Sequence, residues 1–162
     1  MRALSTAEAV RDVQCNPSPP INTSLLLREQ HFGVAEGKTY RTTRESGLSL
    51  EEHFAQDLYP AIRERHLKFP DGESRDDVAG RANQAIDELL IPYVQSARIA
   101  QVEESHIAVV SHGLFIREIT IALMRRGVAN RVGFKGVGPL RNTGWTRLVV
   151  ETTVSRIKTA LK

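Results

Sequence analysis

The sequence predicts an α/β fold with a largely parallel sheet, because apolar runs typical of buried strands alternate with amphipathic helical patterns. Residues 106–110 (HIAVV) form such a run and are rich in β-branched residues. Residues 76–97 carry apolar side chains at three- and four-residue steps, as an amphipathic helix does. In parallel sheets ligands bind beyond the carboxyl ends of the strands, so the polar residues that follow each run are candidate site residues.

The first half of the chain contributes several elements in order. The pattern predicts a helix over residues 4–13, ended by a proline-rich stretch. Residues 25–27 are three leucines that would end a buried strand. Residues 48–66 are expected to be mostly helical, with Pro60 opening a second helix in its first turn. FPDGES, residues 69–74, is rich in turn formers and predicts a turn.

The second half continues the alternation. The helix over residues 76–97 contains Pro92, which should kink or interrupt it. The strand at 106–110 leads at once into a helical pattern that Gly127 should end. A further strand is expected at residues 142–151.

Length and composition suit one globular domain. We expect the 162 residues to form a domain over 1–150 and a short basic tail over 151–162. No apolar run approaches the ~20 residues that span a bilayer, and the N-terminus lacks a signal-peptide pattern, so we expect a cytoplasmic protein without a membrane partner. The single cysteine fits a reducing compartment, and no histidine or cysteine pair has metal-site spacing, so neither a metal nor another cofactor is expected.

Charge is spread unevenly along the chain. Residues 114–162 hold ten Lys and Arg against two acids, within a formal net charge of +3. This basic third could steer an anionic ligand or could be an ordinary solvated surface. It lacks the interleaved aromatic residues of a nucleic-acid-binding surface, so we expect no specific nucleic acid partner.

Polar residues follow both apolar runs at the predicted strand ends. Arg28 and Glu29 follow the leucine run, and Ser111-His112-Gly113 follows the valine run. Gly113 lets a ligand approach the backbone, and the N–H groups of the helix that starts there favour a bound phosphate. A carboxylic acid at Glu29 could protonate a leaving alkoxide. Taken singly, each residue is as well explained by an ordinary turn or a loop salt bridge.

An ordered set of motifs resembles the histidine phosphatase superfamily, in its phosphoglycerate mutase-like branch. The set covers the chain from Arg2 to about Val150 and consists of RALSTAEAV (2–10), LREQHFGVAEG (27–37), FPDGES (69–74), DVAGRA (77–82), VVSHGLFIR (109–117) and NTG (142–144). The resemblance implies a three-layer sandwich, a mostly parallel central sheet flanked by helices. It also implies phosphoryl transfer through a phosphohistidine.

The resemblance also implies roles for single residues. By motif position, Glu29 matches the family's proton donor and His112 matches the second histidine, which contacts the transferring phosphoryl group. Arg2 matches an arginine that grips phosphate, as a guanidinium fork can, and Gly113 belongs to the same phosphate pocket. The remaining candidates are expected to line the substrate site: Arg28, His31 and Glu36.

One family motif has no counterpart. Family members begin with a strand ending in Arg-His-Gly, whose histidine is the nucleophile, and this tripeptide does not occur in the sequence. We therefore expect the chain to be a truncated form of the domain that lacks the first strand and is inactive by itself. An inner sheet edge left without that strand would re-pair or associate with another chain, so a homo-oligomer is one expected outcome.

The substrate is expected to be a phosphorylated small molecule. Residues 38–68 lie where family members differ in what they bind, and here the stretch is short and mixed in charge. That favours a phosphatase over a phosphoglycerate mutase-type phosphotransferase. A non-catalytic phosphoester-binding module is the alternative from a different functional class.

Overall fold

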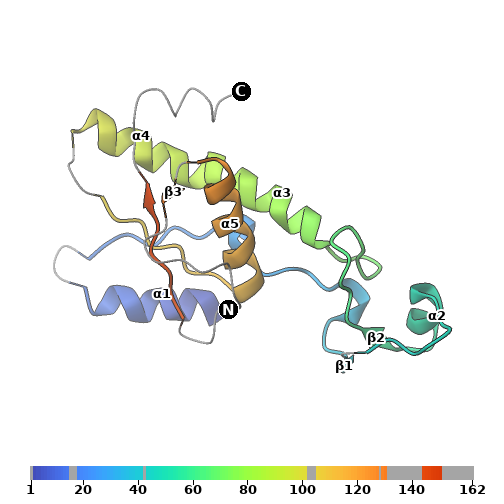
Figure 1. Cartoon of the computed structure of the whole chain (residues 1–162). Helices are drawn as coiled ribbons and strands as arrows, with labels where there is room; N and C mark the ends of the chain where they lie inside the picture. The colour runs from blue at the N-terminus through green and yellow to red at the C-terminus, as the bar shows by residue number, and fades with distance from the viewer. Residues whose placement is uncertain are drawn as a thin grey trace. The chain divides into compact units, whose positions relative to one another are not determined.

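The computed structural model describes residues 2–14, 18–41, 43–101, 105–127, 129–130 and 144–150. The chain divides into two compact units. Unit 1 consists of Met1–Glu29 and Ala79–Lys162, and unit 2 consists of Gln30–Val78. Figure 1 shows the elements of both.

Unit 1 is mainly helical in its described part. Its elements are α1 (Arg2–Asp12), η1 (Leu25–Leu27), most of α3 (Arg75–Ala85), the π-helical segment η3 (Ile86–Leu90), α4 (Ile91–Ile99), α5 (Gly113–Arg125), β3 (Ala129–Asn130) and β4 (Val149–Val150). The strands β3 and β4 pair antiparallel. Helix α1 confirms the helix predicted over residues 4–13.

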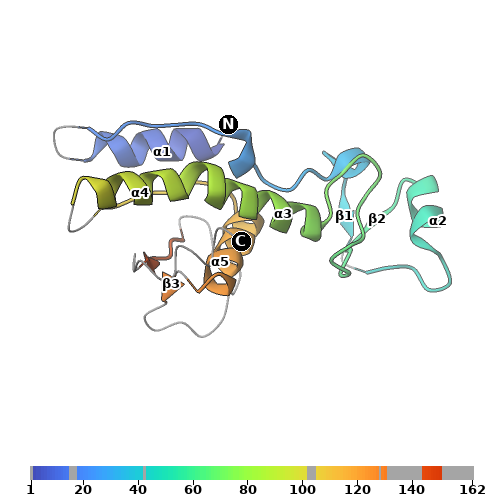
Figure 2. The same cartoon turned by 90° about the horizontal axis from the view of Figure 1, so that it is seen from above.

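The helix predicted over residues 76–97 is present and interrupted. In Figures 1 and 2 the ribbon runs from α3 through η3 into α4 without a break. Pro92 stands in the first turn of α4, directly after the π-helical segment. Because proline lacks an N–H and its ring clashes with the carbonyl four residues earlier, a wider helical turn before it relieves both problems.

Helix α5 starts and ends as predicted. His112, with φ −115° and ψ 162°, is its N-cap residue, and Gly127 follows its end with a φ of +64°. The residues of α5 that are buried in unit 1 include Phe115, Ile119 and Ala122, at the spacing of one helix face. On α3 and η3 the buried residues of unit 1 include Ala82, Ala85 and Ile86.

The leucine run at residues 25–27 is not a buried strand, so that prediction is wrong. It forms the 3₁₀ turn η1, in which the Ser24 hydroxyl accepts a hydrogen bond from the Leu26 N–H. Leu25 is 80% exposed. The carbonyl of Leu26 accepts from the Arg81 guanidinium, so a side chain binds it where a sheet would use a neighbouring strand.

Two other predicted strands are reduced or absent in the described part of the chain. Residues 106–110 have no assigned strand pairing with described residues, and 106–108 are exposed. A strand is stable only when a neighbouring strand satisfies its N–H and C=O groups, and within the described residues the strand pairs are β1–β2 and β3–β4. Of the strand predicted at 142–151, only β4 is seen. Residues 142, 143 and 151–162, including the predicted tail, lie outside the described residues.

Unit 2 is built around a short parallel pair of strands. Its elements are η2 (Gly33–Ala35), β1 (Tyr40–Arg41), α2 (Leu50–Ala55), β2 (Tyr59–Pro60) and the start of α3. Tyr40 pairs with Tyr59, and Arg41 with Pro60. The aromatic rings of Phe54, Tyr59 and Phe69 pack with centroids 5.3–6.3 Å apart.

Only part of the predicted helical stretch 48–66 is helical. Ser49 and Glu52 form a capping box that starts α2, and Asp57, with a φ of +58°, follows its end. Pro60 lies in β2, so the second helix predicted to open there is wrong. The turn predicted at FPDGES is confirmed, with the Gly72 N–H donating to the Phe69 carbonyl at 3.0 Å.

The described residues contain two separate two-stranded sheets, β1–β2 parallel and β3–β4 antiparallel. The three-layer sandwich around one central, mostly parallel sheet stays a prediction. Within the same residues no helix combines the length and the apolar character needed to cross a bilayer.

Candidate functional site

Helix α5 needs acceptors for the N–H groups of its first turn. These groups have no partners within the helix, and the side chain of the N-cap residue His112 makes no capping hydrogen bond. The Glu29 carboxylate supplies the acceptors. Its Oε1 lies 3.2 Å from the Phe115 nitrogen and its Oε2 lies 3.4 Å from the Leu114 nitrogen. The dipole of α5 favours a negative charge at this end.

Glu29 and His112 are thereby brought to the same helix terminus, as the sequence predicted for residues at two strand ends. Glu29 is half-buried, and so is His112. Ser111 further links the segment before α5 to the residues before Glu29, because its hydroxyl donates to the Leu27 carbonyl. The anion that occupies this end of α5 in the structure is therefore the protein's own carboxylate.

Gly113 opens α5 beside this carboxylate. A Cβ built on Gly113 would meet no atom within 4 Å, so the space beside the first helical residue is open. An incoming anion can therefore approach the start of the helix closely, as the sequence predicts for a phosphate-binding glycine.

Both predicted arginines of unit 1, Arg2 and Arg28, are exposed. Arg2 is the first residue of α1 and is exposed, and within the described residues its guanidinium makes no ion pair. Arg28 is also exposed, and its guanidinium reaches the Leu25 carbonyl at 3.4 Å. The phosphate-binding role expected of Arg2 and the substrate-lining role expected of Arg28 stay predictions.

In unit 2 the predicted substrate-lining residue Glu36 binds the backbone of its own loop. Its carboxylate Oε1 accepts from the Phe32 N–H at 2.8 Å. The Glu73 carboxylate Oε2 accepts from the His31 N–H at 3.0 Å. In return, the Glu73 N–H donates to the His31 carbonyl at 2.8 Å. The signature residues of the 27–37 and 69–74 motifs thus tie two loops of unit 2 together.

The His31 ring also belongs to this loop arrangement. Its Nδ1 lies 3.2 Å from the Gly33 nitrogen and 3.2 Å from the Asp71 carbonyl. When Nδ1 is unprotonated, it accepts a hydrogen bond from the Gly33 N–H. When Nδ1 is protonated, it donates to the Asp71 carbonyl. In either tautomer Nδ1 faces the backbone of unit 2. That His31 also lines the substrate site stays a prediction.

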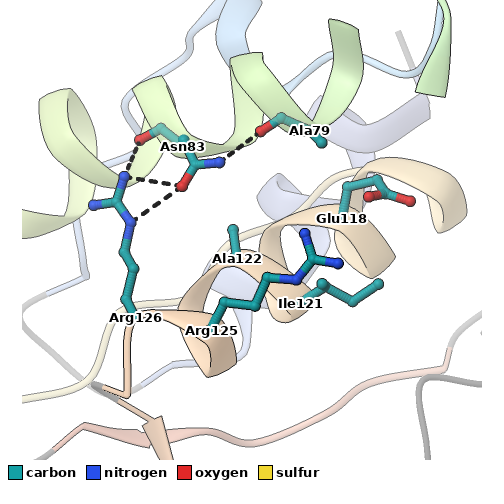
Figure 3. A pocket seen from close by; sticks show the side chains of 7 residues that line it. All are labelled: Ala79, Asn83, Glu118, Ile121, Ala122, Arg125 and Arg126. Atoms are coloured by element: carbon teal, nitrogen blue, oxygen red, sulfur yellow. Dashed lines mark hydrogen bonds between the residues drawn. The ribbon is translucent and has the colours of Figure 1, made fainter. Parts of the chain in front are cut away.

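A small pocket lies elsewhere on unit 1, between α3 and α5 (Figure 3). Its lining residues are Ala79, Asn83, Glu118, Ile121, Ala122, Arg125 and Arg126. Arg126 follows the last turn of α5. Its guanidinium binds the side chain of Asn83 in α3 and forms an ion pair with Asp87 in η3. The hydrogen bond from Arg126 holds the pKa of Asp87 below its usual value. None of the predicted site residues lines this pocket.

Arg81 lies within the DVAGRA motif and was not predicted to have a role of its own. Arg81 is only 8% exposed, and its guanidinium contacts the loop that carries Glu29. An arginine on the apolar face of a predicted helix was the available signal. Among the described residues no cluster of three or more His, Cys, Asp or Glu side chains is arranged to hold a metal ion.

Comparison with protein-family models gives one match. The model described as the histidine phosphatase superfamily (branch 1) matches residues 1–160. Comparison with curated proteins found no match, and comparison with solved structures found none either.

Proposed function

Because the chain belongs to the histidine phosphatase superfamily, branch 1, we propose that it binds phosphate monoesters at the N-terminus of α5, beside Glu29 and His112. Membership supports a function of the phosphatase or phosphotransferase type. Within that class we propose a phosphomonoesterase that acts through a phosphohistidine, on a phosphorylated small molecule.

The observation that carries the proposal is the meeting of Glu29 and His112 at the start of α5. Glu29 accepts from the N–H groups of Leu114 and Phe115, which are also the groups a phosphoryl oxygen would use. Two anions cannot both take the same donors. We therefore propose that a bound phosphoryl group displaces the Glu29 carboxylate and leaves it beside the ester oxygen.

In the proposed reaction a histidine attacks phosphorus while the bond from phosphorus to the ester oxygen breaks. Glu29 in its acid form gives its proton to the leaving oxygen, and His112 contacts the phosphoryl oxygens. Water then attacks the phosphohistidine, and Glu29 takes a proton from that water. Water displaces the histidine from phosphorus, so the two steps together convert one ester and one water into one alcohol and one phosphate.

The nucleophilic histidine is the part that the sequence does not identify. None of the five histidines stands in an Arg-His-Gly sequence. Loss of a covalent nucleophile costs on the order of 10⁶-fold in turnover. We therefore propose that the 162-residue chain binds phosphoesters without hydrolysing them. A non-catalytic binding module is the second candidate function, favoured by the same absence.

Phosphate release from p-nitrophenyl phosphate tests this proposal. The 162-residue chain and the His112→Ala variant should both be inactive, because neither carries the motif that supplies the nucleophile. A chain joined to a segment containing Arg-His-Gly should hydrolyse the ester, and Glu29→Gln in that longer chain should slow hydrolysis by about 10²–10⁴-fold. Hydrolysis by the 162-residue chain that is lost in His112→Ala would contradict the proposal that this chain lacks a nucleophile.

A further inference from the structure

Arg81 contacts the backbone on both sides of Arg28. Its Nη1 donates to the carbonyls of Leu26 at 2.9 Å and Arg28 at 2.8 Å, and its Nη2 lies 3.3 Å from the Glu29 carbonyl. Three carbonyls within four residues thus face one guanidinium. This arrangement fixes the path of the loop that ends at Glu29.

The same guanidinium also contacts the helix that receives the Glu29 carboxylate. It lies over the Phe115 ring, 5.1 Å from the ring centroid, at a distance typical of cation–π contacts. Phe115 is fully buried, and its N–H is one of the two donors to Glu29. One side chain therefore contacts both the loop that carries the carboxylate and the residue that binds it.

We propose that Arg81 is a positioning residue that sets the place of the Glu29 carboxylate at the start of α5. The inference rests on the proposed function of Glu29 but not on turnover. Because Arg81 binds the backbone of the loop that carries Glu29, it keeps Glu29 beside the start of α5 also when a bound phosphoryl group has displaced the carboxylate from the helix N–H groups. Arg81 contacts the Glu29 backbone and the Phe115 ring, while the carboxylate oxygens of Glu29 accept from the N–H groups of Leu114 and Phe115.

The geometry requires arginine and not merely a positive charge. A guanidinium presents its donors in a rigid planar fork and stacks on an aromatic face, whereas a lysine ammonium is a compact point charge. Lysine at position 81 would keep the charge but could not hold three carbonyls and the ring at once.

The backbone amides of Leu114 and Phe115 provide a readout that needs no enzymatic activity. Their ¹⁵N and ¹H chemical shifts, followed by NMR against pH in the 162-residue chain, should show a titration step as Glu29 takes up a proton. Glu29→Gln should remove the step. Arg81→Lys and Arg81→Met should also lose it, while circular dichroism shows that helix content is retained.

Arg126→Met is the matched control. It removes another arginine, which follows α5 and binds Asn83 in α3 and Asp87 in η3 and not the Glu29 loop, as far as the described residues go. This variant should keep the titration step even if it is destabilised as much as Arg81→Met. Retention of the full step in Arg81→Lys would overturn the proposal. Failure of the chain to bind phosphate would leave the step unchanged and would count only against the proposed function.

Discussion

Two glycines in one loop of unit 2 share a left-handed backbone but differ in their surroundings. Gly33 has a φ of +56°, and a Cβ there would lie 1.9 Å from the Pro70 carbonyl oxygen. Gly37 has a φ of +72°, and a Cβ there would meet nothing within 4 Å. Backbone conformation alone therefore restricts Gly37, whereas a second loop also restricts Gly33.

We predict that Gly33→Ala destabilises unit 2 by about 3 kcal/mol, because the clash with a backbone carbonyl adds to conformational strain. Gly37→Ala should cost only about 1 kcal/mol, the strain without the clash. Hydrogen exchange of the Val34 amide, which donates to the Pro70 carbonyl at 3.1 Å, measures both. Equal losses in the two variants would contradict the close approach of the loops at Gly33.

Single residues were predicted best where a chemical role coincides with a helix terminus. His112 and Gly113 were placed at the start of a helix from sequence, and the structure puts them there. The Glu36 carboxylate binds the Phe32 N–H, and its role in lining a substrate site stays a prediction. A sequence cannot separate these roles, because a carboxylate that caps the backbone and one that binds a ligand are the same residue type in the same motif.

Helices were easier to predict than strands in this chain. Helices α1 and α5 satisfy most of their backbone groups internally, so a local pattern suffices to predict them. Strands depend on partners distant in sequence. The three leucines of η1 show the consequence, because Arg81 binds a carbonyl there that a strand would have used in a sheet.

The ion pair between Asp87 in η3 and Arg126 at the end of α5 makes the stability of the folded chain depend on pH. The Arg126 hydrogen bond lowers the pKa of Asp87 in the folded chain, while burial opposes the shift more weakly. A carboxyl group whose folded pKa is lowered adds stability above its unfolded pKa, and that stability is lost as pH falls through the folded pKa. The contribution is therefore present at neutral pH and absent in acid.

We predict that Asp87→Asn lowers the free energy of unfolding by about 0.5–1 kcal/mol at pH 7, since half of the Asp87 side chain is exposed. The difference from the unsubstituted chain should shrink as pH falls below about 4, the usual aspartate pKa. Urea denaturation across pH 3–7 measures this. Glu88→Gln removes an equal charge from a neighbouring carboxylate that binds Gln84, and it should not reproduce the effect. A difference in the free energy of unfolding that grows as the pH falls would contradict the stabilising role of the Asp87–Arg126 ion pair.

At the scale of the whole molecule, the sequence predicted the family correctly, and the family implies an α/β fold, whereas the layout of the central sheet stays a prediction. The family model spans residues 1–160, in agreement with motifs spread over most of the chain. The expected central sheet is not seen within the described residues, where two separate strand pairs occur. Motifs report local chemistry at loops and helix ends, whereas a sheet depends on pairing among all its strands.

The central claim is that phosphate binds at the start of α5 beside Glu29 and His112. The most direct measurement is a ¹⁵N NMR titration of the 162-residue chain with inorganic phosphate, with chloride at equal ionic strength as the control. We predict saturable shifts of the Gly113, Leu114 and Phe115 amides at millimolar phosphate, much weakened in Gly113→Ala because its Cβ would fill the open space. No change at these amides, or stronger changes at another site, would contradict the claim.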